Sequence, residues 1–343
     1  MSDAYTRQAA PLIAAIEAEM QAVLAEKQPG IKPFYGMIHY HMGWVDEQFA
    51  PLAGNGGKRI RPVLCLLACA AAGGDWQQAV PAGAAIEILH NFTLIHDDIQ
   101  DASPTRRGRP TVWTIWGSPQ AINAGDAMFA AAHLAMARLF DRGVPAAAVV
   151  QAIRRLDETC LDLTIGQHLD MDFEGRAAVV VDEYLRMING KTAALLALCT
   201  ELGAIIAGQD EKTIRHYQQF GLKLGLAFQV IDDILGIWGE EAVIGKSAAT
   251  DIETRKKTLP VLFGIAESSA LRDLYEEPAD SHDGQFVSEA IRLLDEIGAR
   301  EFAEAKATEL TSSALEHFAA ASPAGDAGQA LEALTANLLR REH

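Results

Sequence analysis

The sequence predicts an all-α protein, and three observations lead to this fold class. Apolar residues recur at spacings of three and four through most of the 343 residues, which is typical of helices. Alternating, strand-like runs are scarce, and the valine triplet at 179–181 is too short to anchor a sheet. Glycine and proline gather at joints between the periodic stretches.

The helices are predicted in chain order from this periodicity. Two of the helical stretches, at 80–99 and 211–237, contain paired aspartates after an apolar run. Seven stretches carry the helical spacing: 4–26, 60–72, 80–99, 119–140, 146–171, 181–207 and 211–237. The joints lie at 54–57, 103–110, 143–145, 239–245, 278–284 and 322–328.

No joint is long or biased enough to divide the chain. We therefore expect one all-helical domain covering residues 1–343, larger than the usual domain, with its core at about 54–265. Two further helices, at about 286–320 and 326–341, are expected to be peripheral.

Charge and composition exclude several classes of protein. The formal charge of −17 argues against nucleic acid as a partner, because a phosphate-binding surface needs a basic field. The longest apolar stretch, at about 192–208, is interrupted by Glu201 and is too short for stable membrane insertion. The first twenty residues lack a basic segment followed by an apolar run, so no signal peptide is expected.

The four cysteines do not form a disulfide framework in a chain of this length, which favours a reducing cytoplasm. Cys65 and Cys69 lie four apart on an apolar helix. They fit a metal site or a thiol pair, but buried small apolar residues are the favoured interpretation.

A first acidic cluster consists of Asp97, Asp98 and Asp101. On a helix Asp97 and Asp101 share a face, with Asp98 alongside. Carboxylates this close repel one another unless a cation lies between them, and Mg²⁺ typically takes one or two carboxylates plus phosphate oxygens and water. The alternative is a solvated acidic helix end.

A second cluster, Asp232 and Asp233, lies within the apolar segment FQVIDDILGIWG. Unpaired charges there would be costly, so a partner or a metal is expected, the alternative being a capped helix end. Two similar acidic helices predict two walls that face each other across one cavity.

Basic residues accompany both clusters despite the negative net charge. A glycine-rich loop with Lys58 and Arg61 runs into a helix start, which is a common anion site. Arg106 and Arg107 follow the first cluster and offer planar bidentate donors to phosphate, or merely balance charge. Further cations lie near the second cluster in the sequence: Lys191, Lys246, Lys256 and Lys257. Two diphosphate sites account for both sets.

The ordered motifs GGKRIRP, HDDIQD, RRGRPT, GDAMFA, GQHLDMDFE, GKTA, FQVIDDIL and KKTLP resemble those of the trans-isoprenyl diphosphate synthases, also called polyprenyl synthetases. The resemblance covers about residues 54–265. It implies an isoprenoid synthase-type helical bundle with a central cavity between two Asp-rich helices.

By this resemblance, the metal ligands for about three Mg²⁺ ions are Asp97, Asp101 and Asp232, with Asp98 and Asp233 in support. The allylic diphosphate would contact Arg106, Lys191, Lys246 and Lys256. Isopentenyl diphosphate would bind to Lys58, Arg61, His90 and Arg107. The catalytic residues implied are Lys191, Thr192 and Gln229, of which Thr192 and Gln229 would lie near the reacting carbons. Gln167 and Asp170 would line the same cavity.

Two departures from the family pattern are present. Gly236 stands where the second acidic motif usually ends in aspartate, which removes a metal or water contact from that wall. Trp113 stands where histidine is frequent and is interpreted as packing. His96, beside Asp97, is interpreted as a structural residue.

The resemblance implies transfer of an allylic group to isopentenyl diphosphate, with dimethylallyl, geranyl and farnesyl diphosphates as candidate starters. Phe92 lies five residues before Asp97, about 7.5 Å deeper along the helix, with Thr93 and Leu89 nearby. An aromatic residue there resembles the pattern of enzymes that stop near C20, so geranylgeranyl diphosphate is the expected product and farnesyl diphosphate the alternative. Plain core packing of Phe92 is also possible.

Two other functions remain open at this point. A class I terpene cyclase would share the scaffold but needs no second diphosphate site, and the typical Asn/Asp-x-x-Ser-x-x-x-Glu motif is absent. A non-catalytic regulatory subunit would share the CxxxC of Cys65 and Cys69. A homodimer is expected from the family alone.

Overall fold

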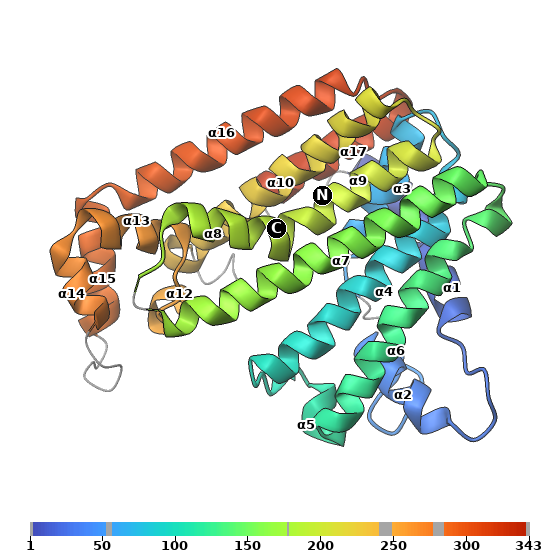
Figure 1. Cartoon of the computed structure of the whole chain (residues 1–343), viewed down its shortest axis with the longest axis horizontal. Helices are drawn as coiled ribbons and strands as arrows, with labels where there is room; N and C mark the ends of the chain where they lie inside the picture. The colour runs from blue at the N-terminus through green and yellow to red at the C-terminus, as the bar shows by residue number, and fades with distance from the viewer. Residues whose placement is uncertain (1–2, 53–56, 177, 240–248, 277–284, 341–343) are drawn as a thin grey trace.

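The computed structural model describes residues 3–52, 57–176, 178–239, 249–276 and 285–340 (Figure 1). The first elements in chain order are α1 (Asp3–Val23), α2 (Lys32–His41), α3 (Ile60–Ala71), α4 (Trp76–Gln100), β1 (Thr105–Arg106), β2 (Arg109–Pro110), α5 (Val112–Trp116), α6 (Ser118–Ala137) and η1 (Phe140–Arg142). The remaining elements are α7 (Ala146–Gly175), α8 (Val181–Ile188), η2 (Asn189–Ala193), α9 (Ala194–Ile206), α10 (Glu211–Trp238), α12 (Thr250–Glu253), α13 (Leu259–Glu267), α14 (Ser269–Glu276), α15 (Gln285–Glu296), α16 (Ala299–Ala320) and α17 (Gly325–Arg340).

The predicted all-α class is confirmed. The only sheet within the described ranges is the short antiparallel pair of β1 and β2, in which Arg106 lies opposite Arg109. Its two-residue turn has positive φ at both positions, +52° at Arg107 and +73° at Gly108, the backbone twist that suits a tight hairpin. This hairpin was expected only as an irregular joint, and it carries the arginines that follow the first acidic cluster.

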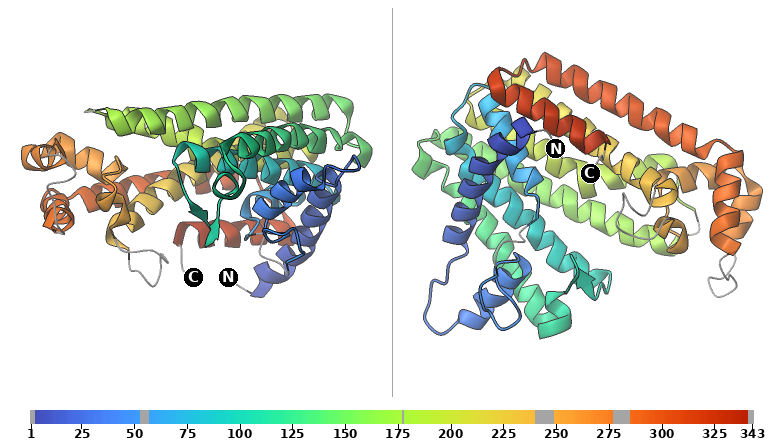
Figure 2. Two further views of the ribbon diagram at one scale, coloured as in Figure 1. Left: turned by 90° about the horizontal axis from the view of Figure 1, so that it is seen from below. Right: turned by 180° about the vertical axis from the view of Figure 1, so that it is seen from behind.

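Long helices form the body of the molecule. α4 packs against α3 and α6, α9 packs against both α3 and α10, and α10 packs along α16. In Figure 1, α7 crosses the front of the molecule between α9 and α4, and Figure 2 shows α16 along one outer edge. Apolar side chains of these helices form a continuous buried core that includes Ile86, Leu198 and Phe220.

The C-terminal region differs from the expected peripheral pair of helices. The stretch 286–320 is two helices, α15 and α16, because Gly298 adopts φ +72° between them and ends the helical path. α16 contributes Ala303, Ala307 and Leu310 to a core cluster shared with α8 and α10. It is therefore part of the central packing, and α17 packs against α3.

The predicted helix at 181–207 contains an irregularity that positions two site residues. Residues Asn189–Ala193 form a π-helical turn, η2, which carries Lys191 and Thr192. α7 approaches this turn so closely that a Cβ on Gly166 would lie 2.2 Å from the backbone N of Lys191. A Cβ on Gly190 would lie 2.5 Å from the carbonyl oxygen of Asp162. Glycine is thus required on both sides of this contact.

Two expectations about composition can be compared with the structure. All four cysteines are buried and unbridged, and burial raises the pKa of Cys69 to about 12, as expected for small apolar core residues. Among the described helices, none has both the length and the hydrophobicity that a membrane crossing requires.

Candidate active site

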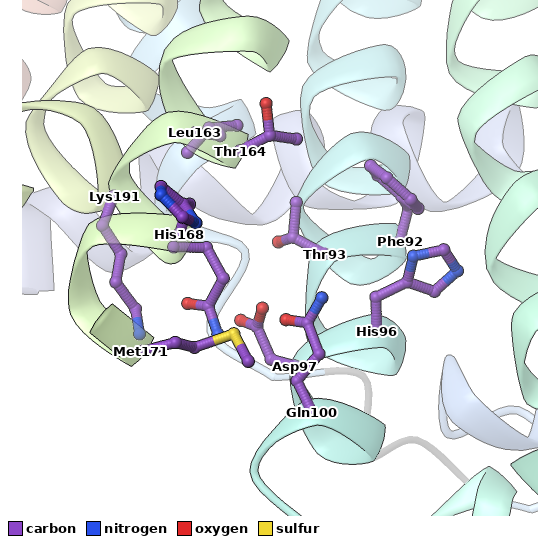
Figure 3. A pocket seen from close by; sticks show the side chains of 11 residues that line it. Phe92, Thr93, His96, Asp97, Gln100, Leu163, Thr164, His168, Met171 and Lys191 are labelled. Carbon is purple, nitrogen blue, oxygen red and sulfur yellow. The ribbon is translucent and has the colours of Figure 1, made fainter. Parts of the chain in front are cut away.

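A cavity of about 260 Å³ lies between the C-terminal half of α4 and the facing side of α7 (Figure 3). It is lined by Phe92, Thr93, His96, Asp97 and Gln100 of α4, by Leu163, Thr164, Gln167, His168 and Met171 of α7, and by Lys191 of η2. Both polar atoms of the Gln167 amide are buried without a hydrogen-bond partner in the described part of the chain. A buried, unpaired amide of this kind is ready to bind a ligand.

Asp97 is partly buried in the wall of this cavity. Burial raises the pKa of its carboxyl group to about 6, Lys191 opposes this change, and Asp101 adds to it. The negative charge of the Asp97 carboxylate is therefore only partly balanced by Lys191, and an additional cation nearby would stabilise it.

Asp98 has a different position from the one expected of a supporting metal ligand. It is 2% exposed, and its Oδ1 accepts a hydrogen bond from Nε of Arg106 at 2.8 Å. Burial raises the pKa of Asp98, and Arg106 is the largest influence against this rise. Asp98 therefore anchors the arginine hairpin to α4 and faces away from Asp97, as neighbouring positions on a helix do.

Asp101 is exposed and lines a second cleft, of about 510 Å³, together with Asp170, Lys191 and Lys256. Lys191 donates a hydrogen bond to Asp170. Lys257 instead donates to the carbonyl oxygens of Phe173 and Arg176, so it ties its loop to the end of α7. The first acidic cluster thus opens onto a cleft that is lined by Lys191, Lys256 and Lys257.

The second acidic wall lies on α10. Asp233 is 1% exposed and accepts hydrogen bonds from Tyr184, from the backbone N of Leu259 at 3.1 Å and from Nε2 of Gln229 at 3.1 Å. Gln229 in turn accepts from the Thr192 hydroxyl at 2.9 Å. The expected metal-binding role does not suit Asp233, since both carboxylate oxygens are occupied inside the protein.

Burial raises the pKa of Asp233 to about 6, while the hydrogen bond from Tyr184 and the charge of Lys256 oppose the rise. Asp232, the neighbouring residue, is only partly buried. Of the two aspartates, Asp232 remains the one that can meet a ligand.

Lys256 brings the two walls together. It lines the same cleft as Asp101, and although burial opposes the change, Asp251, Asp233, Asp170 and Asp232 together raise its pKa. The carboxylates of α4 and α10 therefore act on one shared cleft, as the two acidic motifs predict.

Asp251 is a site residue that sequence reasoning missed. A Cβ on Gly236 would lie 2.2 Å from Oδ2 of Asp251, so this carboxylate occupies the space beside the position where the motif lacks its final aspartate. The available signal was the position of Asp251 at the start of the charged segment DIETRKK, 251–257, which follows the second motif.

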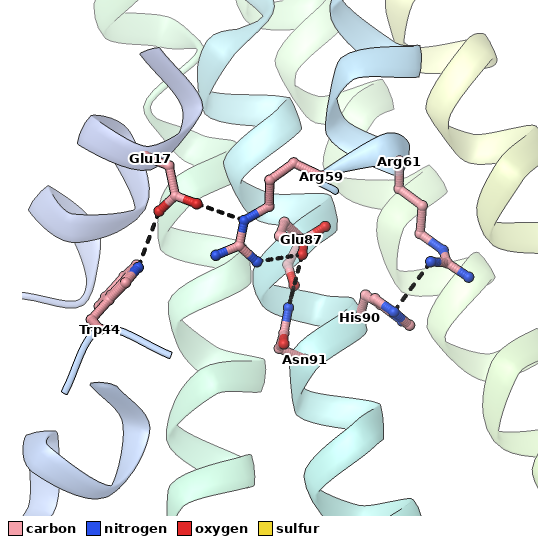
Figure 4. Close-up of polar contacts among 7 residues, drawn as sticks. All are labelled: Glu17, Trp44, Arg59, Arg61, Glu87, His90 and Asn91. Atoms are coloured by element: carbon pink, nitrogen blue, oxygen red, sulfur yellow. Dashed lines mark hydrogen bonds and ion pairs between the residues drawn. The ribbon is translucent and has the colours of Figure 1, made fainter. Parts of the chain in front are cut away.

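Of the residues expected to bind isopentenyl diphosphate, Arg61 at the start of α3 and His90 of α4 lie next to each other (Figure 4). Nη1 of Arg61 lies 3.2 Å from Nε2 of His90, and Lys58 is exposed. Burial, then Arg61 and Arg107, holds the pKa of His90 well below its usual range, so the ring is neutral. A Cβ on Gly57 would lie 3.7 Å from the guanidinium carbon of Arg107, which places this arginine at the same loop.

Arg59 is a supporting residue that sequence reasoning did not single out. It is 3% exposed and binds Glu17 at 2.6 Å and Glu87 at 2.7 Å, which ties the start of α3 to α1 and α4 (Figure 4). Because both carboxylates pair with Arg59, they do not form ion pairs with Arg61 or Lys58, which remain available to an anionic ligand.

Phe92 lines the cavity five residues before Asp97 on α4 and is more buried than Asp97. Its ring centroid lies 5.3 Å from that of Phe129 on α6 and 4.9 Å from that of His96. Thr93 also lines the cavity, whereas Leu89 is fully buried and is not among its lining residues. Trp113 packs against the core and donates to the carbonyl oxygen of Ser103 at 2.9 Å, as its interpretation as packing predicts.

Two expected features of the site concern Lys246 and the metal ligands. Lys246 lies outside the described residues, so its expected contact with a diphosphate is not placed. Within the described ranges, no three His, Cys, Asp or Glu side chains form a metal site by themselves.

Comparison with known proteins agrees with this geometry. Residues 42–294 match the Polyprenyl synthetase family. The chain is 44% identical over 315 residues to a geranylgeranyl diphosphate synthase of Mycobacterium tuberculosis, covering 91% of this chain and 87% of that protein. It is 39% identical over 313 residues to a (2E,6E)-farnesyl diphosphate synthase of Mycobacterium bovis, covering 89% and 86%.

Solved structures give the same result. A geranylgeranyl pyrophosphate synthetase from Pyrococcus horikoshii superposes with a TM-score of 0.85 at 32% identity, over 99% of both chains. A polyprenyl synthetase from Streptomyces coelicolor gives a TM-score of 0.84 at 33% identity, over 96% of this chain and 99% of the other. The chain therefore belongs to the polyprenyl synthetase family and is a prenyltransferase of the trans-isoprenyl diphosphate synthase type.

Proposed function

We propose that this enzyme condenses isopentenyl diphosphate with an allylic diphosphate and releases geranylgeranyl diphosphate, C20. The observation that carries the proposal is the shared cleft, in which Asp101 and Asp170 face Lys191 and Lys256 beside a cavity that contains Phe92. A dianionic head and a long apolar tail fit this pair of spaces.

The residues proposed to hold Mg²⁺ are Asp97 and Asp101 from α4 and Asp232 from α10. The raised pKa of Asp97 supports this assignment, because burial leaves its negative charge short of a cation. Since the described protein side chains do not form a complete metal site, diphosphate oxygens and water would supply the remaining ligands of about three ions. Bound Mg²⁺ would stabilise the negative charge that develops on the leaving diphosphate.

The protein's own cations have two proposed tasks. Lys191, Lys256 and Arg106 would bind the allylic diphosphate, joined by Lys246 on the basis of family resemblance. Lys58, Arg61, His90 and Arg107 would bind isopentenyl diphosphate. A neutral His90 serves there as a hydrogen-bond donor or acceptor without adding charge.

The condensation requires an ionised allylic group to meet the double bond of isopentenyl diphosphate in the absence of water. Thr192 and Gln229, fixed by their hydrogen bond to each other and to Asp233, are proposed to line the place where these carbons meet. Lys191 is proposed to remain beside the departing diphosphate, and the proton lost from the product is proposed to pass to that diphosphate.

The product length is proposed to depend on Phe92, which Phe129 and His96 hold in place at the deep part of the cavity. Phe92→Ala should lengthen the product by one or more C5 units, because the ring no longer stops the tail. Thr93→Ala is the matched control on the same wall and should change length less. An unchanged C20 product from Phe92→Ala would remove the assignment.

The proposed reaction is tested by incubating the purified protein with isopentenyl diphosphate, Mg²⁺ and dimethylallyl, geranyl or farnesyl diphosphate, followed by mass analysis. Geranylgeranyl diphosphate from each starter is the expected product, and farnesyl diphosphate as the end point would support the shorter alternative. A hydrocarbon would indicate a terpene cyclase. Complete inactivity of the protein alone, with activity on adding a partner, would indicate a regulatory subunit.

A homodimer is proposed to form through α6 and α7. The apolar side chains exposed on these two helices include Ile122, Phe129, Leu161 and Ile165, and His133 of α6 pairs with Asp157 of α7 beside them. Large apolar side chains gathered on neighbouring helices are typical of contact surfaces. Light scattering should give twice the mass of one chain for the wild type. Leu161→Glu should lower the measured mass towards that of one chain.

We also propose a cytoplasmic location for the enzyme.

A further inference from the structure

A third cavity, of about 220 Å³, lies between α2 and the arginine hairpin. The hairpin side is strongly basic, with Arg106, Arg107 and Arg109, and Gly57 of the glycine-rich loop lines the same space. The α2 side contributes Tyr40 and His41. None of the sequence motifs draws attention to α2, although it forms one wall of this basic space.

His41 has a polar atom that the described protein leaves unused. Its Nε2 is shielded from solvent and has no hydrogen-bond partner within the described residues, and the same holds for Oδ1 of the nearby Asn91. His39, on the same helix, contrasts with it, because its Nε2 lies 2.9 Å from the carbonyl oxygen of Leu24. A buried polar atom without a partner is costly unless a ligand completes it.

The charges around His41 select an anion as that ligand. Burial, then Arg107 and Arg106, lowers the pKa of His41 to about 3, and the Asn91 side chain opposes this effect. The neutral ring can donate one N–H while the arginines supply positive charge. His41 also contributes to the lowered pKa of His90, so the two rings lie in one electrostatic environment with Arg61.

The hairpin holds α2 in a fixed position. The Tyr40 hydroxyl donates to the carbonyl oxygen of Pro110 at 2.8 Å, and Arg109 lies over the Tyr40 ring at 3.9 Å. Arg109 also donates to the carbonyl oxygen of Tyr40 at 3.3 Å. His41 directly follows Tyr40 in the sequence, and Tyr40 is bound to the hairpin that carries Arg107.

We propose that His41 is a further binding residue for isopentenyl diphosphate, donating its Nε2–H to an oxygen of the diphosphate that Arg107 and Arg61 hold. This proposal rests on the proposed function above and adds α2 to the elements that recognise the second substrate. The allylic diphosphate, held in the cleft of Asp101 and Lys256, is not expected to contact it.

The test compares His41→Phe, which keeps a ring but no donor, with His41→Gln, which keeps a donor. Calorimetric titration with isopentenyl diphosphate in EDTA isolates the arginine and lysine site, since allylic binding is proposed to need Mg²⁺. His41→Phe should weaken this binding about tenfold and raise the KM for isopentenyl diphosphate similarly, as expected for a lost hydrogen bond to a charged group. His41→Gln should stay within about threefold.

The matched control is His39→Gln on the same helix, which should leave isopentenyl diphosphate binding unchanged. The KM for the allylic substrate should not change in any of the three variants. Unaltered binding by His41→Phe, or equal losses for both substrates, would overturn the proposal.

Wild-type protein provides a second measurement that does not depend on the folding of a variant. In ¹⁵N spectra of the histidine rings, the His41 signal is identified by its absence from the spectrum of His41→Gln. Adding inorganic pyrophosphate and EDTA to the wild-type protein should shift this signal, and an unshifted signal would contradict the proposal. If wild-type protein binds isopentenyl diphosphate but forms no product, the proposed function fails while the assignment of His41 stands.

Discussion

The acidic walls of α4 and α10 both carry a pair of adjacent aspartates, but the buried second aspartate is stabilised differently in each. On α4, the second aspartate of the pair, Asp98, is buried against the cation Arg106. On α10 the corresponding residue, Asp233, is buried among neutral donors, namely Tyr184, Gln229 and the backbone N of Leu259. In both pairs the first aspartate is only partly buried.

This difference leads us to propose that each pair of aspartates contains one metal ligand and one anchor. The anchor on α4, Asp98, holds the arginine hairpin, whereas the anchor on α10, Asp233, holds the hydrogen-bonded pair of Gln229 and Thr192. A cationic anchor and a neutral anchor should respond differently to substitution and to pH. Four experiments test the proposed difference between the acidic walls of α4 and α10.

The largest effect is expected from Asp97→Asn, compared with Asp98→Asn. Loss of the Asp97 carboxylate, which lines the cavity, should lower kcat/KM by about 10³-fold, because it would remove the proposed charge stabilisation of the leaving group. Asp98→Asn should cost roughly tenfold, since it only loosens the hairpin. Steady-state kinetics with saturating Mg²⁺ measures both, and equal losses would show that ligand and anchor are not distinct.

The anchors themselves are compared by Arg106→Leu and Tyr184→Phe in urea unfolding without ligands. Arg106→Leu leaves the buried Asp98 without its cation and should lower the free energy of unfolding by about 2 kcal/mol, allowing for the partial exposure of the arginine. Tyr184→Phe removes one of three donors and should cost about 1 kcal/mol. The reverse order would mean that the neutral anchor is the more important one.

The pH dependence of stability should distinguish the anchor on α10. The pKa of Asp233 is raised to about 6 in the folded protein, so the folded state holds a proton that the unfolded state releases. This group's contribution to stability is full below about pH 4 and is lost as the pH rises through 6.

Asp233→Asn removes that titration and can keep the hydrogen bonds if the Gln229 amide and the Thr192 hydroxyl reverse direction. The stability of the wild type relative to Asp233→Asn should therefore fall by about 2 kcal/mol between pH 4 and pH 7. Urea unfolding at both pH values gives this difference. A difference independent of pH would show that Asp233 is ionised throughout.

The smallest effect concerns the missing final aspartate of the second motif. The motif alone suggests that Gly236→Asp would strengthen metal binding, but a Cβ there would lie 2.2 Å from Oδ2 of Asp251. We expect Gly236→Asp to displace Asp251 and to raise the Mg²⁺ concentration for half-maximal activity about threefold, a change of under 1 kcal/mol. Gly236→Ala, which adds the Cβ without a charge, is the control and should act in the same direction.

Much of this architecture follows from the sequence. Helical periodicity predicts the fold class and most of the long helices, and the spacing of Asp97 and Asp101 predicts a shared face because helix geometry fixes it. Local pattern does not reveal the break at Gly298, since the flanking segments are both helical. It also does not predict the central position of α16, because an apolar face does not identify the surface that it will contact.

The site shows the same limit. Sequence gives the residue types, but burial decides which member of each acidic pair meets a ligand, and burial depends on contacts such as Asp98 with Arg106 that are set by tertiary structure. Asp251 and His41 were missed because their proximity to Gly236 and to Arg107 arises only when separate segments pack together.

The π-helical turn η2 has a consequence for protein engineering. A π turn contains one residue more than the α-helical turn that would otherwise connect α8 to α9. Deleting Gly190 should therefore restore an unbroken α-helix with α8 and α9 in nearly their present orientations, but it would change how Lys191 and Thr192 of this turn are presented to the site. Insertions and deletions, usually assigned to loops, can thus alter specificity from inside a helix at this one position.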